Sequence, residues 1–210
     1  MDISEIRATI AQAKHHESAT GQLRRLLTQQ LPTLHTAIQL PQLQPVAALL
    51  EFVSAYIESA PDFLEAAAAI VRDARIEPCT QQLLQLAQDN FLKPSEADHP
   101  VGLDELMNEA YLLHRLLEEL NDRYRIVTGA PLLPQDMDTT AANLIGHHLI
   151  GEPFANALDE AVHFSIDQLM HRLTPSFGIQ PPAQAANEEK VWASEERHWP
   201  RLTQPLSLSF

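Results

Sequence analysis

The stretch that decides the fold is LDELMNEAYLLHRLLEELNDRYRIV, residues 103–127. Its apolar side chains recur every three or four residues, the spacing that places them on one face of an α-helix. They are Leu103, Leu106, Ala110, Leu113, Leu117, Leu120 and Tyr124. Gly129 follows, and glycine commonly ends a helix because it adopts a left-handed conformation at little cost. The stretch therefore predicts a long amphipathic helix.

The composition of the whole chain is also typical of helices. Glycine is scarce, with 6 in 210 residues, while Leu, Ala, Gln and Glu dominate, and their side chains lose little freedom in a helix. Hydrophobic residues make up 45% of the chain, enough to bury a core without disulfide bonds. We expect an all-α, single-domain bundle of about seven or eight helices.

Similar signals place further helices on both sides of this stretch. Asp2 and Glu5 form a capping-box pattern at the start of the first helix, which could be interrupted near residues 18–21. Pro61 and Pro78 predict two helix starts, because proline fits the first turn of a helix and disrupts its interior. The remaining expected helices span about residues 2–30, 46–59, 62–75, 78–92, 138–150 and 153–173.

The last part of the chain breaks this pattern. After a bundle over residues 1–175, the proline-rich residues 176–210 predict an extended C-terminal arm with one short helix near 187–197. This interaction arm carries Trp192, Trp199 and Phe210, large side chains that need to be covered from water. We expect the two tryptophans to pack on the bundle or on a second subunit rather than on a foreign partner.

The charge and the absence of targeting signals narrow the class of protein. A formal net charge of −14 opposes binding to nucleic-acid phosphates, and the pair Arg24-Arg25 is interpreted as the outer edge of an amphipathic helix. No run approaches the roughly 20 apolar residues that cross a bilayer, and the first residues do not resemble a secretory signal. A single cysteine, Cys79, suits a reducing compartment. We expect a cytoplasmic protein that binds neither nucleic acid nor membrane.

One helix carries residues with metal-ligand spacing. Glu160 and His163 have the Glu-x-x-His spacing of di-iron bundles, and Asp167 and His171 follow at intervals of four residues. Helix geometry places these four side chains opposite the apolar side, which is marked by Phe154, Leu158, Val162, Ser165, Leu169 and Leu173. Bundle metal sites project inward, so we predict a solvated face and no metal.

Two histidines are candidates for a pocket. His114 lies at the margin of the leucine face, near Asn121, and is expected to be half-buried. In IGHHLIG, residues 145–151, His148 leans toward the apolar side of its helix. Gly146 and Gly151 flank this position and predict close backbone approach, a ligand or a frayed helix, because glycine weakens a helix by about 1 kcal/mol relative to alanine.

The sequence lacks the glycine-containing signatures of serine hydrolases, phosphate-binding loops and dinucleotide folds. Cys79 has no identifiable histidine partner. We therefore expect a non-enzymatic protein without a cofactor, acting through protein–protein interaction or homodimerisation. The alternative is an enzyme or carrier, analogous in size and helix count to ferritin-like or haem-oxygenase-like bundles. In that alternative His114, His148 and Asn121 line one cavity, which could hold iron or haem.

Overall fold

The computed structural model describes residues 3–73, 81, 84, 85, 88, 89, 91, 92, 101–173, 202 and 206–209. Within these ranges the helices with defined bounds are α1 (Ile3–Thr20), α2 (Gln22–Gln30), α3 (Pro45–Asp73), α5 (Leu103–Thr128), α6 (Thr140–Ile150) and α7 (Phe154–Leu173). The short 3-10 helices η1 (Leu31–Thr33) and η2 (Gln135–Met137) connect some of them. The all-α prediction is confirmed, with six delimited α-helices in the described part instead of seven or eight.

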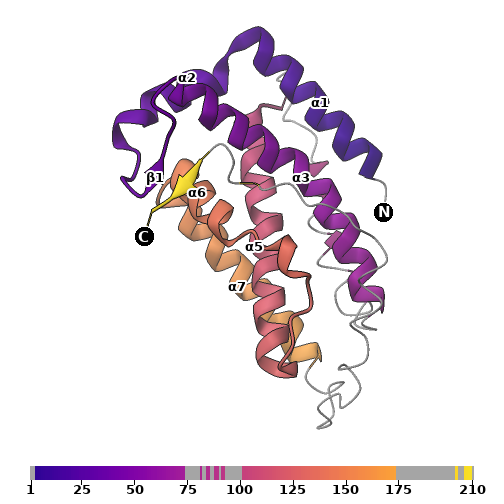
Figure 1. The fold of residues 1–210 in the computed structure, drawn as a ribbon. Coiled ribbons are helices and arrows are strands. Elements are labelled where there is room, and N and C mark those ends of the chain that lie inside the picture. The colour runs from indigo at the N-terminus through magenta and orange to yellow at the C-terminus, as the bar shows by residue number, and fades with distance from the viewer. Residues whose placement is uncertain are drawn as a thin grey trace.

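Helix α5 occupies the centre of the bundle. It packs against α1, α3, α6 and α7, and Figure 1 shows it between α3 and α7. The predicted leucine face is buried from Leu103 to Leu120. Because α5 has neighbours on several sides, the buried surface is wider than the predicted stripe and includes Met107, Tyr111 and Leu116. The polar residues of α5 must therefore find partners inside the bundle.

Helix α3 runs through Pro61 without ending. The prediction of separate helices before and after this proline is wrong, because Pro61 lies inside a single helix of 29 residues. Proline in a helix interior removes one backbone hydrogen bond and costs about 3 kcal/mol. Large side chains on both sides of it, including Phe52, Tyr56 and Phe63, are fully buried. Their burial against the rest of the bundle offsets the cost.

The N-terminal helical region does break, as the sequence suggested, at Gly21. This residue has a φ of 63°, a left-handed conformation that turns α1 into α2. The side chain of Glu17 is buried at the corner. Its carboxylate accepts hydrogen bonds from the backbone N–H groups of Leu23 (2.8 Å) and Arg24 (3.0 Å), which are otherwise unpaired at the start of α2.

The end of the chain returns to its N-terminal half. Strand β2 (Ser207–Leu208) pairs antiparallel with β1 (Ile38–Gln39), and Leu202 and Leu206 are buried. Figure 1 shows the yellow C-terminal strand at the indigo N-terminal half of the chain. The described residues of the predicted arm thus pack on their own bundle. Trp192, Trp199, Phe210, Cys79 and the helix expected near 187–197 lie outside the described residues.

Two further features bear on the expectations from sequence. Residues 81, 84, 85, 88, 89 and 91 are helical, in agreement with the helix expected over 78–92.

No helix within the described residues has both the length and the apolar character needed to cross a bilayer.

Substitution Glu17→Ala removes the cap of α2 and should lower the free energy of unfolding by about 1–2 kcal/mol, because two amide groups lose their acceptor. Urea unfolding followed by circular dichroism measures this difference. The exposed Glu51 provides the control, since Glu51→Ala should change the stability by less than about 0.5 kcal/mol. An equal effect of both substitutions would contradict a capping role for Glu17.

Candidate functional site

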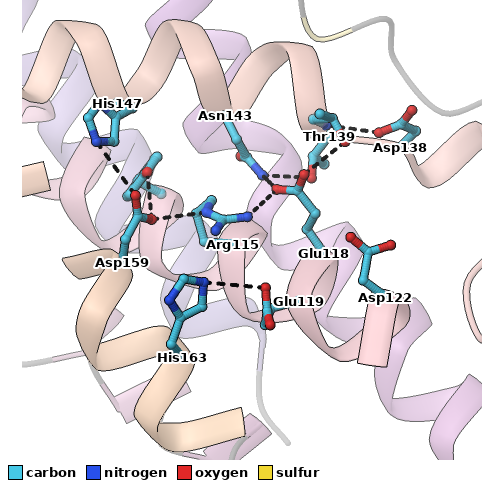
Figure 2. A network of polar contacts seen from close by, with 12 residues as sticks. Arg115, Glu118, Glu119, Asp122, Asp138, Thr139, Asn143, His147, Asp159 and His163 are labelled. Atoms are coloured by element: carbon cyan, nitrogen blue, oxygen red, sulfur yellow. Dashed lines mark hydrogen bonds and ion pairs between the residues drawn. The ribbon is translucent and has the colours of Figure 1, made fainter. Parts of the chain in front are cut away.

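A partly buried network of polar contacts joins α5, α6 and α7 (Figure 2). Its centre is the partly buried Arg115 of α5. The Nε group of Arg115 donates to Asp159 Oδ1 of α7 at 3.0 Å, and its Nη1 group donates to Glu118 Oε2 at 2.6 Å. The planar guanidinium holds both carboxylates in a fixed geometry. Burial lowers the pKa of Arg115, but these hydrogen bonds outweigh it and hold the pKa above its usual value.

Glu118 extends the network to α6. It accepts hydrogen bonds from Asn143 Nδ2 (2.6 Å) and Thr140 Oγ1 (2.8 Å) in addition to that from Arg115. The buried Asn143 in turn accepts a hydrogen bond from the hydroxyl of Tyr56 in α3 at 2.6 Å. A continuous chain of hydrogen bonds therefore connects α7, α5, α6 and α3.

Asp159 is the second carboxylate that holds the network together. Its Oδ1 atom accepts a hydrogen bond from Tyr111 at 2.8 Å, and its Oδ2 atom lies 3.5 Å from Nε2 of His147. Burial and the hydrogen bond to Asp159 raise the pKa of Tyr111, and burial raises the pKa of Tyr56. Both phenols remain protonated and act as hydrogen-bond donors. The network supplies structural hydrogen bonds rather than a free base or nucleophile.

Gly146 lets α6 approach the two tyrosines of this network. A Cβ atom at this position would lie 3.2 Å from Cδ2 of Tyr111 and 3.6 Å from the hydroxyl oxygen of Tyr56. Of the three alternatives expected at Gly146, the structure shows close approach, and the approaching groups are aromatic side chains. Gly151 has a φ of 83° and lies at the C-terminal end of α6.

His114 is fully buried, not half-buried as the sequence suggested. Its Nε2 atom lies 3.1 Å from the carbonyl oxygen of Tyr56 and 3.2 Å from Oγ of Ser59, and its ring packs edge-on against Phe63. Its Nδ1 atom has no hydrogen-bond partner among the described residues. Burial lowers the pKa of His114 to about 4, which keeps the ring neutral at pH 7. The surrounding side chains are mostly apolar, so His114 behaves as a core residue.

The other two pocket candidates have different partners. His148 Nε2 accepts a hydrogen bond from the backbone N–H of His35 at 3.0 Å, and partial burial and His35 lower the pKa of His148. Asn121 Oδ1 accepts hydrogen bonds from the N–H groups of Leu132 and Leu133, both at 2.9 Å. His148 therefore fastens the segment after α2, and Asn121 shapes the loop after α5. His148, Asn121 and His114 therefore have different hydrogen-bond partners.

The exposed face of α7 agrees with the prediction. Glu160, His163, Asp167 and His171 are all exposed. His163 and Asp167 also reach α5, where Nε2 of His163 lies 3.5 Å from Glu119 and Asp167 lies 3.2 Å from Arg123. No group of three or more His, Cys, Asp or Glu in the described ranges is arranged to hold a metal ion. Further Glu-x-x-His steps begin at Glu96 and Glu195, outside the described residues.

The buried face of α7 is shifted from the predicted one, because it includes Ala155 and Ile166, which the prediction did not assign to it, and excludes Phe154. Ala155, Val162, Ile166 and Leu169 are buried, but Phe154 is 51% exposed. Phe154 has the spacing of the predicted face, but it is the first residue of α7 and its side chain is exposed while that of Ala155 is buried. Phe154 is therefore an apolar side chain on the surface.

Phe154 lies on one wall of a surface groove with a volume of about 210 Å³, which we call the α2–α7 groove. Its lining comes from α2, the start of α5, the end of α6 and the start of α7. The lining residues are Leu23, Leu26, Leu27, Gln30, Asp104, Glu105, Met107, Asn108, Leu149, Ile150 and Phe154. The groove has a largely apolar floor and a polar rim that includes two carboxylates.

A larger cleft of about 470 Å³ lies beside the polar network, between α5 and the loop before α6. Glu118, Asn121, Asp122 and Arg125 line it from α5. These polar groups already have partners in the chain: Glu118 binds Arg115, Asp122 lies 3.2 Å from Arg125, and Asn121 holds the loop. The cleft is therefore walled by side chains engaged in structural contacts.

Comparison with known proteins gives no indication of the function of this chain. No family model, curated protein or solved structure matches the chain.

The sequence analysis did not predict the residues of the polar network. Arg115 and Glu118 have the i, i+3 spacing of a helical ion pair, which was a usable signal. Asp159 is 44 residues from Arg115, and no local pattern indicates that contact.

Substitution Arg115→Met should lower the free energy of unfolding by about 2–4 kcal/mol, because it leaves Glu118 and Asp159 partly buried without their cation. Urea unfolding at neutral pH measures the loss. Arg123, which pairs with Glu119 and Asp167 at a more exposed position, provides the control, and Arg123→Met should cost less than about 1 kcal/mol. Similar losses for both variants would show that Arg115 is not a special constraint.

The buried His114 predicts a pH dependence of stability. Its pKa is lowered from 6.5 to about 4, so above pH 6.5 both the folded and the unfolded chain carry a neutral ring. Between pH 6.5 and about 4 only the unfolded chain takes up the proton, and the free energy of unfolding falls by about 1.4 kcal/mol per pH unit. The total loss from this residue is roughly 3 kcal/mol and is complete below pH 4.

Urea unfolding at several pH values tests this dependence. The variant His114→Phe keeps an aromatic ring in the core but cannot titrate, so the stability of the wild type relative to this variant should fall on acidification. His171→Gln changes an exposed histidine and should follow the wild type. A stability difference between the wild type and His114→Phe that stays constant from pH 7 to pH 4 would exclude the buried neutral state.

Proposed function

We propose that this protein is non-enzymatic and binds a segment of another protein in the α2–α7 groove. One observation carries the proposal. Leu26 of α2 and Phe154 of α7 are 40% and 51% exposed, and both line the same groove. Large apolar side chains that gather over an apolar floor mark a surface that gains free energy when a partner covers it.

The floor of the groove is suited to hold an anchoring side chain. Leu23 and Leu27 of α2, Met107 of α5 and Leu149 of α6 are buried there. Apolar anchors that enter such surroundings supply much of the binding energy at protein interfaces, while a polar rim excludes water. The α2–α7 groove has both parts, with Gln30, Asp104, Glu105 and Asn108 among its polar lining residues.

The polar network supports binding rather than catalysis. Glu118 and Asp159 are held by Arg115 and by hydroxyl and amide donors, and both tyrosines act as donors. His114 is buried and neutral at pH 7. Catalytic acids and bases need access to a substrate and a free lone pair or proton. These side chains use theirs within the bundle.

A display library of helical peptides tests the proposal. Peptides selected on the wild-type protein should lose binding to the double variant Leu26→Ser/Phe154→Ser by about tenfold or more, because both walls of the groove lose their apolar anchors. Phe164 is 65% exposed on the same helix and does not line the groove, so Phe164→Ser is the matched control and should retain binding.

Circular dichroism and urea unfolding should show that the double variant is folded, since both substituted side chains are substantially exposed. The proposal fails if no peptide is enriched on the wild type, or if the enriched peptides bind the double variant as tightly as the wild type.

A further inference from the structure

We infer, resting on the proposed function of the groove, that its occupant is an amphipathic helix whose polar flank carries lysine or arginine. The juxtaposition that supports this is a pair of carboxylates, Asp104 and Glu105, at the rim of a groove that is otherwise apolar or neutral. Three observations favour this occupant: the unpaired charge of the rim, the lack of a strand edge among the lining elements, and the negative charge of the competing occupants.

The rim carboxylates have no basic partner in the described part of the chain. Asp104 accepts hydrogen bonds only from the neutral amide of Gln22, at 3.2 and 3.3 Å, and Glu105 is exposed. Elsewhere in the bundle carboxylates such as Glu118 and Asp159 are paired with arginine. Both rim residues lie in the first turn of α5, where the helix dipole stabilises negatively charged side chains. That position stabilises them but leaves their charge open to a partner.

The two arginines of α2 do not cancel this charge. Arg24 and Arg25 lie on α2 next to Leu23, but they are about 100° and 200° from it around the helix axis. Both are exposed, and Arg25 Nη1 donates to the carbonyl oxygen of Thr20 at the corner between α1 and α2. Neither lines the groove. A cationic group on the partner would therefore find the two carboxylates unopposed.

The walls of the groove favour a helix over an extended peptide. All four lining elements are helices, so the groove offers no strand edge to a partner. The carbonyl oxygen of Leu149, near the end of α6, is already bound by Nε2 of Gln30 at 2.9 Å. An extended peptide needs a strand edge to pair its backbone, whereas a helix pairs its own and inserts only side chains.

Charge also argues against two other occupants of the groove, a second copy of the chain and the chain's own segment around Trp192. A second copy of the chain would bring together two molecules that each carry a formal net charge of −14. The segment NEEKVWASEER around Trp192 contains four glutamates against one lysine and one arginine. Neither complements an acidic rim as well as a basic helix does.

Three fluorescent peptides of about 14 residues test the inference by anisotropy at low ionic strength, with the full chain as the receptor. They share a leucine and alanine face, and their polar face carries lysine, glutamine or glutamate. The lysine peptide should bind about tenfold tighter than the glutamate peptide, and added salt should reduce that difference. The double variant Asp104→Asn/Glu105→Gln should abolish the preference for lysine.

The matched control is Glu51→Gln/Glu160→Gln, which changes the net charge by the same amount at exposed positions that do not line the groove. It should keep the preference. The inference is overturned if the glutamate peptide binds as tightly as the lysine peptide, or if the control variant loses the preference to the same extent as the rim variant. All three peptides could instead bind equally tightly, and Leu26→Ser/Phe154→Ser could remove the binding of all three. That result would overturn the charge requirement and leave the proposed function standing.

Sedimentation of the chain alone tests the competing occupant. A wild-type dimer that dissociates in Leu26→Ser/Phe154→Ser would place a second copy in the groove and overturn the inference. A monomer that binds none of the peptides would overturn both the inference and the proposed function.

Discussion

The guanidinium of Arg115 is the interaction on which the arrangement of the bundle depends. Helix α5 is covered on several sides, and the side chain of Arg115 is largely buried there. Its charge therefore needs partners within the protein. Arg115 meets this requirement by holding Glu118 of α5 and Asp159 of α7. Glu118 then binds Asn143 of α6, and Asn143 binds Tyr56 of α3. A single network centred on Arg115 thus links α7, α6 and α3 to α5.

The α2–α7 groove is a consequence of that arrangement. The network sets α6 and α7 on α5, and Gly146 allows α6 to lie close to the two tyrosines. At the far end of α6, Leu149 accepts from Gln30 of α2, and His148 accepts from the backbone of His35. These contacts bring the start of α7 to the surface near α2, so Phe154 and Leu26 line one groove. The polar interior positions the apolar surface.

Local spacing was sufficient to predict the helices and much of the core. The leucine face of residues 103–120 is buried as expected, and the exposed face of α7 carries Glu160, His163, Asp167 and His171. Spacing failed where a distant partner decides the outcome. Pro61 stays inside α3 because packing on both sides outweighs one lost hydrogen bond. Phe154 shares the period of the apolar face but lies at the end of its helix. His114, His148 and Asn121 bind different partners, which no periodicity could separate.

Native-state hydrogen exchange tests the central claim that α5 and its polar network organise the bundle. The amides from about Leu106 to Leu120 should exchange only through global unfolding, with a free energy equal to that from urea unfolding. Amides of α6 and α7 next to Asn143 and Asp159 should be the next most protected. If α5 exchanges through local opening at a lower free energy than α1 and α2, the bundle is not organised around this helix and the account is wrong.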